Sequence, residues 1–362
     1  MPLTASAAPR FHSLRVRDVT RETADAISVT FDIPNELTGA FAFTAGQYLT
    51  VRTNLAGEEV RRSYSICSGV DDGEVRIAIK RLEDGVFSVW AQEALRPGLP
   101  IEVMTPTGRF GIPALAGSGH VHAGFAAGSG ITPVLSIMKT VLARDNDSRF
   151  FLFYGSRATA DILFRGALED LKDRYLGRLS VFHVLSQEQQ DIEALNGRLD
   201  REKLGLLLSR VLGGVTIDAA YVCGPFGMID AVEAALSDIG VPPERVHVER
   251  FNSALSGRPR AKRTVVASEP HATASVILDG TRTELSVARD ESVLDAAMRA
   301  GLDLPFSCKG GMCSTCRAKV VEGSVAMTVN YSLDPWEIDA GFVLTCQALP
   351  TTPHVVIDYD QQ

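Results

Sequence analysis

The feature that most constrains this chain is a group of four cysteines toward its C-terminal end. Cys308, Cys313 and Cys316 follow the spacing C-x4-C-x2-C, and Cys346 stands alone further along the chain. This spacing is typical of a plant-type [2Fe–2S] cluster, for which one compact loop supplies three thiolates and a distant segment supplies the fourth. The pattern therefore predicts that these four cysteines bind such a cluster.

Structural zinc is the main alternative use of four thiolates. Zinc sites are usually built from two closely spaced cysteine pairs, whereas here the fourth cysteine has no neighbour in the sequence. A disulfide framework would require an oxidising compartment. The first ten residues contain no cationic segment followed by an apolar run, so they do not resemble a signal peptide and we expect a cytoplasmic protein.

Charge is distributed unevenly along the chain. The net charge is −8 over 362 residues, and residues 272–362 hold six Lys and Arg against twelve Asp and Glu. This acidic segment is either an ordinary solvated surface or a docking face for a basic partner. Nucleic acid would be repelled. The longest uncharged stretch, residues 110–138, is interrupted by glycines and prolines, so we expect no membrane-spanning helix.

The N-terminal part, residues 9–115, is predicted to be an antiparallel β-barrel. Its apolar residues alternate with polar ones over short, closely spaced segments that Gly, Asp and Asn separate. The expected strands include 11–19, 26–33, 47–53 and 75–81, and one helix is expected over 87–95.

Residues 116–251 are predicted to be a doubly wound α/β domain, because apolar strand candidates alternate there with amphipathic helices. The expected strands are 122–126, 150–154, 179–185, 219–223 and 246–249, and the expected helices are 133–144, 162–175, 201–211 and 227–239.

Residues 252–271 are basic and lack apolar periodicity, which predicts a flexible linker. The remaining residues, 272–362, form the third predicted domain. A hairpin is expected around Asp279-Gly280, and a helix over 292–300 is expected to be capped by Ser292. The cysteine loop follows this helix directly.

The segment Arg61-Arg-Ser-Tyr-Ser65 is a candidate flavin site. Tyr64 offers an aromatic face, Ser65 a polar edge and Arg62 a cation for a pyrophosphate, although an ordinary amphipathic strand would alternate in the same way. Gly85-Val-Phe-Ser88 opens a predicted helix, whose N–H groups would attract the same pyrophosphate. Ser88 alone could also be a plain helix cap.

The segment Ala127-Gly-Ser-Gly-Ile-Thr-Pro133 follows the first strand of the α/β domain. Its glycines let the backbone approach a dinucleotide pyrophosphate, although they also suit tight strand-to-helix packing. After the second strand, Ser156 and Arg157 offer a hydroxyl and a cation for the 2′-phosphate of NADPH. Arg157 could instead pair with Asp161, and residues 186–188 add no further cation.

The order of these segments resembles the ferredoxin–NADP reductase family, which also carries R-x-Y-S, G-x-x-S and, beside the nicotinamide, C-G-P. The resemblance implies that FAD is bound by Arg62, Tyr64, Ser65, Lys80, Gly85 and Ser88. It implies that the nucleotide is bound by Gly128, Gly130, Thr132, Pro133, Ser156, Arg157, Cys223 and Gly224. It implies that Glu249 and Phe251 close the flavin site, and that Tyr64, Ser65, Cys223 and Glu249 are the catalytic group.

With the cysteine loop included, the chain resembles the reductase components of bacterial multicomponent oxygenases, among them those that serve the ring epoxidation of phenylacetyl-CoA. The resemblance implies a β-grasp (α+β) ferredoxin domain. It also implies that hydride passes from NADPH to FAD, and that single electrons pass through the cluster to di-iron oxygenase subunits. A reductase for a steroid-ring hydroxylase or an aromatic-ring dioxygenase is the alternative, and a redox-sensing flavin and iron–sulfur protein is another.

Overall fold

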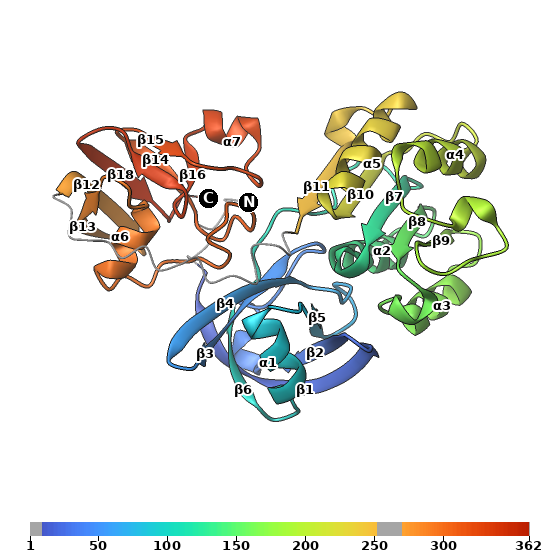
Figure 1. Ribbon diagram of the computed structural model, residues 1–362, viewed down its shortest axis with the longest axis horizontal. Coiled ribbons are helices and arrows are strands. Elements are labelled where there is room, and N and C mark those ends of the chain that lie inside the picture. The colour runs from blue at the N-terminus through green and yellow to red at the C-terminus, as the bar shows by residue number, and fades with distance from the viewer. Residues whose placement is uncertain (1–8, 252–269, 362) are drawn as a thin grey trace.

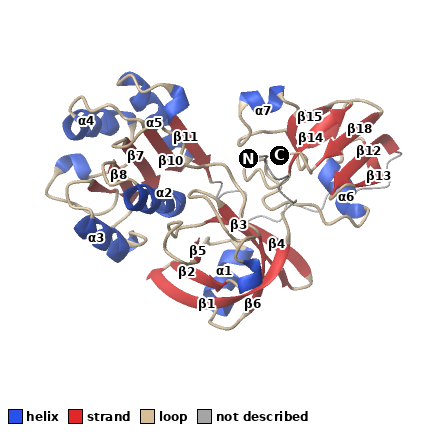
Figure 2. Ribbon diagram, turned by 180° about the vertical axis from the view of Figure 1, so that it is seen from behind, coloured by secondary structure: helices blue, strands red, loops and turns tan. Residues whose placement is uncertain are grey.

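The computed structural model describes residues 9–251 and 270–361. Its strands form three main sheets, and each sheet lies in a separate lobe of the molecule (Figure 1). Both views place the first lobe between the other two (Figures 1 and 2). Within the described residues, no helix is long and apolar enough to cross a membrane. The predicted linker lies outside the described residues except for its last two positions.

The first lobe is an antiparallel six-stranded sheet with the order β4-β3-β6-β1-β2-β5. A bridge between Ile66 and Ile77 joins the β4 end of the sheet to β5, which closes the barrel. The strands are β1 (Phe11–Thr23), β2 (Ala26–Asp32), β3 (Tyr48–Leu55), β4 (Glu58–Ser65), β5 (Val75–Lys80) and β6 (Pro100–Met104), and the helix is α1 (Val86–Ala94). The barrel confirms the prediction for this part of the chain.

Strand β6 was not among the expected strands. It has five residues and begins at Pro100, so its alternation is too short to identify from the sequence. It pairs with both β1 and β3, and it therefore lies at the centre of the sheet. Pro100 is tolerated there because it is the first residue of the strand.

The second lobe is a five-stranded parallel sheet with the order β11-β10-β7-β8-β9. The strands are β7 (Val121–Ala127), β8 (Arg149–Ser156), β9 (Leu179–Leu185), β10 (Ala219–Gly224) and β11 (Val246–Arg250). The helices are α2 (Ile131–Arg144), α3 (Arg165–Arg174), α4 (Arg201–Leu212) and α5 (Phe226–Asp238). Short 3-10 helices span Asn35–Leu37, Gly128–Gly130, Thr159–Asp161, Glu193–Leu195 and Pro243–Arg245.

Helices cover both faces of this sheet, as a doubly wound fold requires. Helices α2 and α3 pack on Tyr154 and Tyr221, whereas α4 and α5 pack on Phe153 and Val222. Successive residues of one strand therefore point to opposite faces of the sheet and pack in two different cores. Helix α3 begins three residues later than expected, because Phe164 has φ 58°, a left-handed conformation that interrupts a helix.

The third lobe has a five-stranded mixed sheet with the order β13-β12-β18-β14-β16, and β15 and β17 form a separate ribbon. The strands are β12 (Pro270–Leu278), β13 (Thr281–Ala288), β14 (Arg317–Glu322), β15 (Val325–Met327), β16 (Phe342–Leu344), β17 (Ala348–Pro350) and β18 (His354–Asp358). The helices are α6 (Val293–Arg299) and α7 (Pro335–Asp339). This α+β arrangement confirms the predicted fold class.

The start of this lobe differs from the expected boundary. Strand β12 begins at Pro270, inside the predicted linker, because Ala272 and Thr273 already pair with β13. The hairpin at Asp279-Gly280 is present as expected, with φ of 52° and 71°. Ser292 caps α6 by accepting a hydrogen bond from the N–H of Asp295. The sequence signals for the hairpin and the helix start are therefore confirmed.

Candidate functional site at the junction of the three lobes

The predicted flavin strand is β4, and the helix that follows β5 lies against it. The ring of Tyr64 packs on Phe87 of α1, with 5.7 Å between ring centroids. Gly85 is the N-cap of α1 and provides no side-chain cap. The strand residues and the helix N-terminus therefore lie close together, as a shared site for a flavin and its pyrophosphate requires.

Ser88 has a different local role from a helix cap. Its hydroxyl accepts a hydrogen bond from the N–H of Leu82, at 3.0 Å, and donates one to the carbonyl of Gly85, at 3.2 Å. A Cβ at Gly85 would lie 2.3 Å from this hydroxyl oxygen. Ser88 thus fixes the turn before the helix, and only glycine fits at position 85.

Lys80 and Arg157 share one carboxylate. Asp25 lies 3.4 Å from the Lys80 ammonium and 3.2 Å from the Arg157 guanidinium, which also pairs with Asp161 at 2.8 Å. The surface pair considered for Arg157 is therefore present. The Arg157 side chain is 52% exposed, and an exposed pair of this kind contributes little to stability, so a phosphate could compete for it. The hydroxyl of Ser156 is buried and has no hydrogen-bond partner among the described residues.

The glycine turn after β7 packs tightly against the end of β10. A Cβ at Gly130 would lie 2.1 Å from the carbonyl oxygen of Cys223, so no side chain fits there. A Cβ at Gly128 (φ 54°) would have no described atom within 4 Å beyond its chain neighbours. Thr132 donates from its hydroxyl to the carbonyl of Ser129, at 2.9 Å, and holds the turn. Pro133 is buried in the first turn of α2.

Two of the predicted site residues, Ser65 and Glu249, form a hydrogen bond between the barrel and the α/β domain. The hydroxyl of Ser65 donates to a carboxylate oxygen of Glu249 at 3.2 Å. Burial raises the pKa of Glu249 to about 8, and the bond from Ser65 opposes this only in part. Cys223 is opposite Glu249 in the strand register, and burial raises its pKa well above the usual range. The Cys223 thiol is therefore neutral, and Phe251 packs against the nearby core.

The predicted cluster ligands lie in two thiol pairs. Cys313 is the main cause that lowers the pKa of Cys308, and Cys316 is the main cause that lowers the pKa of Cys346, so the thiols of each pair lie beside each other. Two pairs suit a binuclear cluster, in which each iron takes two cysteines.

Donors around the sulfurs also suit a cluster. The N–H of Gly310 donates to Cys308 Sγ at 3.3 Å, the hydroxyl of Thr315 donates to Cys313 Sγ at 3.2 Å, and the amide of Gln347 donates to Cys346 Sγ at 3.3 Å. The loop is tightly wound, because Lys309, Gly311 and Ser314 have positive φ of 50°, 75° and 48°. Hydrogen bonds of this kind stabilise the negative charge of an iron–sulfur centre.

The loop with the cysteines contacts the barrel at the flavin strand. Tyr48, which pairs with Ser65 in the sheet, donates from its hydroxyl to the carbonyl of Cys313. Burial lowers the pKa of Arg62, and the nearby Tyr64 and Cys308 oppose this effect, so Arg62 and Cys308 interact electrostatically. The candidate flavin and cluster sites are therefore neighbours.

Two groups of charged residues hold this contact. Arg61, whose side chain is 4% exposed, pairs with Asp303 and donates to the carbonyl of Leu304 at 3.2 Å. Its guanidinium also lies 4.0 Å from the ring centroid of Phe306. On the other side, the buried carboxylate of Glu337 pairs with Arg109 from the barrel and with Arg317 at 2.7 Å.

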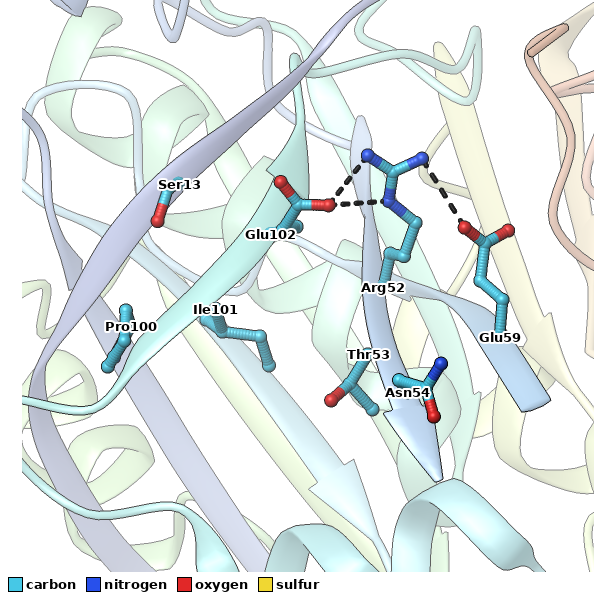
Figure 3. Close-up of a pocket in the computed structure, with 8 residues that line it drawn as sticks. All are labelled: Ser13, Arg52, Thr53, Asn54, Glu59, Pro100, Ile101 and Glu102. Carbon is cyan, nitrogen blue, oxygen red and sulfur yellow. Dashed lines mark hydrogen bonds and ion pairs between the residues drawn. The ribbon is translucent and has the colours of Figure 1, made fainter. Parts of the chain in front are cut away.

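A cavity of about 370 Å³ lies on another part of the barrel. Its lining residues are Ser13, Arg52, Thr53, Asn54, Glu59, Pro100, Ile101 and Glu102 (Figure 3). Arg52 is held there by Glu102 and Glu59, and none of the predicted flavin residues line the cavity. It is therefore distinct from the predicted flavin site, although Arg52 also pairs with Asp303 of the third lobe at 3.1 Å.

Three family models match successive parts of the chain. They are an oxidoreductase FAD-binding domain over residues 13–112, an oxidoreductase NAD-binding domain over residues 125–234, and a 2Fe-2S iron-sulfur cluster binding domain over residues 276–351. The order is the one that the sequence motifs predicted. Binding domains for FAD, a nicotinamide dinucleotide and a [2Fe–2S] cluster are thus present in one chain.

Relatives of known function match over almost their full length. The chain is 46% identical to one of the subunits of the 1,2-phenylacetyl-CoA epoxidase of Escherichia coli, over 97% of this chain and 98% of that protein. It is 36% identical to the ferredoxin reductase component of 3-ketosteroid-9-alpha-monooxygenase of Rhodococcus rhodochrous, over 96% of each. The structure of phthalate dioxygenase reductase has the same fold, with a TM-score of 0.59 at 22% identity over 96% of this chain and 98% of that one.

Proposed function

The chain belongs to the family of oxygenase reductase components that join FAD-binding, NAD-binding and [2Fe–2S] domains, and from this premise we propose that it transfers electrons from NADPH to a di-iron oxygenase acting on phenylacetyl-CoA. In this proposal FAD is held within residues 9–115, the nucleotide within 116–251 and the cluster within the third lobe, which begins with β12 at Pro270.

The observation that carries the proposal is the meeting of three sites around the end of β4. Ser65 contacts Glu249 of the α/β domain, and Tyr48 beside Ser65 bonds the cysteine loop. Arg61, on the same strand as Ser65, pairs with Asp303 of the cysteine-bearing domain. A hydride donor and a one-electron carrier would thus lie on two sides of one flavin. When bound, FAD accepts a hydride and releases single electrons, which the cluster carries onward.

The residues of this chain bind and orient these groups. Arg62 and the N-terminus of α1 neutralise the flavin pyrophosphate, and Tyr64 provides an aromatic surface. Glu249, with a pKa of about 8, keeps its proton at neutral pH, so it adds no negative charge beside the ring. Cys223 is neutral for the same reason and serves as a packing surface for the nicotinamide.

NADPH is proposed as the donor because a hydroxyl and a guanidinium follow β8. Ser156 has a buried hydroxyl without a partner in the described part of the chain, and Arg157 is paired only with surface carboxylates. A 2′-phosphate would give both groups a charge-assisted hydrogen bond. The carboxylate that would favour the ribose of NADH is not found at these two positions.

The proposed partner is a set of di-iron oxygenase subunits. Support comes from the 46% identity to the epoxidase subunit and from the acidic character of residues 272–362, which suits a basic docking face. The four cysteines form no disulfide in the structure, and the cytoplasm, which keeps thiols reduced, is the proposed compartment. A reductase for a 3-ketosteroid oxygenase is the second candidate, because such a component is 36% identical.

Anaerobic addition of NADPH to the protein loaded with FAD and cluster tests the electron path. We expect the flavin absorbance to bleach first and the electron paramagnetic resonance (EPR) signal of a reduced [2Fe–2S] cluster to follow. Rapid turnover with an artificial acceptor would also argue against a redox sensor. Failure of NADPH to bleach the flavin, in protein that retains FAD, would overturn the proposal.

A further inference from the structure

Tyr48 reaches from the flavin domain into the cysteine loop of another domain. It is the first residue of β3 and is 5% exposed. Its backbone N–H donates to the carbonyl of Thr107 at 2.8 Å, and the N–H of Thr107 donates back at 3.0 Å. A Cβ at Gly108, where φ is 112°, would lie 2.8 Å from the Tyr48 ring. The barrel therefore fixes the position of this ring and of its hydroxyl.

The hydroxyl of Tyr48 contacts two residues of the loop. It donates to the carbonyl of Cys313, and it lies 2.9 Å from the hydroxyl oxygen of Thr315. Thr315 in turn donates to Cys313 Sγ at 3.2 Å. A continuous chain of hydrogen bonds thus runs from the barrel to one of the proposed cluster sulfurs.

The protons of this chain have one favoured arrangement. A cysteine sulfur that binds iron is anionic, so it is the stronger acceptor for the single proton of Thr315. The Thr315 oxygen then needs a proton from Tyr48, which shares its own proton between that oxygen and the Cys313 carbonyl. The positive end of the Tyr48 hydroxyl dipole therefore points toward the loop in either case.

Negative charge on the loop increases when the cluster accepts an electron. Hydrogen bonds to the sulfurs favour the more negative state and raise the reduction potential of an iron–sulfur centre. When one hydrogen-bond donor polarises a second donor, the hydrogen bond that the second donor makes becomes stronger. The reduction potentials of plant-type clusters are low for electrons that come from NADPH, so a higher cluster potential would favour electron transfer from the flavin.

We propose that Tyr48 is a positioning residue for the cluster. From the neighbouring domain, Tyr48 raises the reduction potential of the cluster through Thr315 and the Cys313 carbonyl. The inference rests on the proposed function, because it takes Cys313 as a cluster ligand. Since the bond spans two domains, the potential also depends on their contact, and reduction of the cluster in turn stabilises that contact.

Redox potentiometry monitored by EPR tests this proposal on the full chain loaded with FAD and cluster. In Tyr48→Phe, we expect the cluster potential to fall, so that the equilibrium constant for electron transfer from flavin to cluster drops by up to about tenfold, or about 59 mV for one electron. The rate of flavin reduction by NADPH should not change. Tyr221→Phe is the matched control, because this buried tyrosine forms a hydrogen bond with His122 in the α/β domain. The cluster potential of this variant should equal that of the wild type.

Thr315 provides a second, independent variant. Thr315→Val should lower the potential, whereas Thr315→Ser, which keeps the hydroxyl, should preserve it. Adding Tyr48→Phe to Thr315→Val should lower it by less than Tyr48→Phe alone does. An unchanged or higher potential in Tyr48→Phe with an intact EPR signal would overturn the inference, as would an unchanged potential in Thr315→Val. A wild-type protein that forms no [2Fe–2S] signal after reconstitution would instead contradict the proposed function.

Discussion

Ser65 and Glu249 lie on different domains, and the hydroxyl of the first donates to the carboxylate of the second at 3.2 Å. Ser65 ends the strand that the R-x-Y-S motif occupies, and Glu249 is on the last strand of the parallel sheet. Their contact places a buried carboxyl group where the proposed flavin and nicotinamide sites meet. Its unusual environment leads to the first prediction.

Glu249→Gln should change how the stability of the protein depends on pH. Burial raises the pKa of Glu249 from 4.5 to about 8, so between these pH values the folded protein binds a proton that the unfolded chain does not. The free energy of unfolding of the wild type should therefore fall with rising pH in this window, by about 1.4 kcal/mol per pH unit at most. Urea denaturation at pH 5, 7 and 9 measures this free energy of unfolding.

The Glu249→Gln variant should show a flatter profile and should be the more stable protein at pH 9. Glu188→Gln serves as a control, because this exposed carboxylate has a lowered pKa and lies outside the junction. Identical pH profiles for wild type and Glu249→Gln would show that Glu249 is ionised in the folded protein.

Cys313→Ser should abolish the cluster and leave flavin reduction by NADPH intact, because a serine hydroxyl is a poor replacement for a thiolate ligand. Iron and sulfide content and stopped-flow absorbance measure the two properties. Cys67→Ser is the matched control: this thiol is buried in the core and donates to the carbonyl of Arg76, so the cluster content should be that of the wild type. Loss of both properties in Cys313→Ser would mean that the domains do not work independently.

Arg157→Ala should raise the KM for NADPH about 10- to 100-fold, with little effect on NADH, because a hydrogen bond to a charged group contributes about 1.5–3 kcal/mol. Steady-state reduction of an artificial acceptor with each nucleotide measures this. Asp161→Asn is the control, since it removes a surface partner of Arg157 but keeps the cation. An equal rise in the KM for NADPH and for NADH would remove the argument for a 2′-phosphate site.

Arg61→Ala should slow electron transfer from flavin to cluster severalfold or more and leave the hydride step unchanged. Arg61 is nearly fully buried at the domain contact, where it joins Asp303, Leu304 and Phe306. Its loss should weaken docking by roughly 1–3 kcal/mol. Single-turnover stopped-flow measurements separate the two steps.

Arg165→Ala is the control for this variant, because its pair with Glu169 is exposed on α3, and such pairs contribute little. A transfer rate in Arg61→Ala equal to that of the wild type would show that Arg61 does not hold the domains in the conformation that transfers electrons.

The sequence was sufficient for the fold class because each domain has its own local signals. Alternation of strands and helices predicted the parallel sheet around β7, and the cysteine spacing predicted the [2Fe–2S] domain. Strand β6 was missed because five residues that begin with proline do not show a period. The start of α3 was missed because nothing in the sequence marks the left-handed Phe164.

Contacts between domains could not be predicted in the same way. Tyr48 and Cys313 are 265 positions apart, and no spacing rule connects them. Arg61 looked like part of the flavin motif, but its side chain faces Asp303 in the cysteine-bearing domain. Such residues are identified only when the relative positions of folded domains are known, because their partners depend on packing and not on local pattern.

The most direct test of the proposed function is the consumption of NADPH and oxygen by this protein mixed with the di-iron oxygenase subunits of a phenylacetyl-CoA epoxidase. We predict that consumption depends on phenylacetyl-CoA and yields about one epoxide per NADPH. NADPH oxidation that is independent of phenylacetyl-CoA and forms no epoxide, while a 3-ketosteroid oxygenase is supported with coupled product formation, would contradict it.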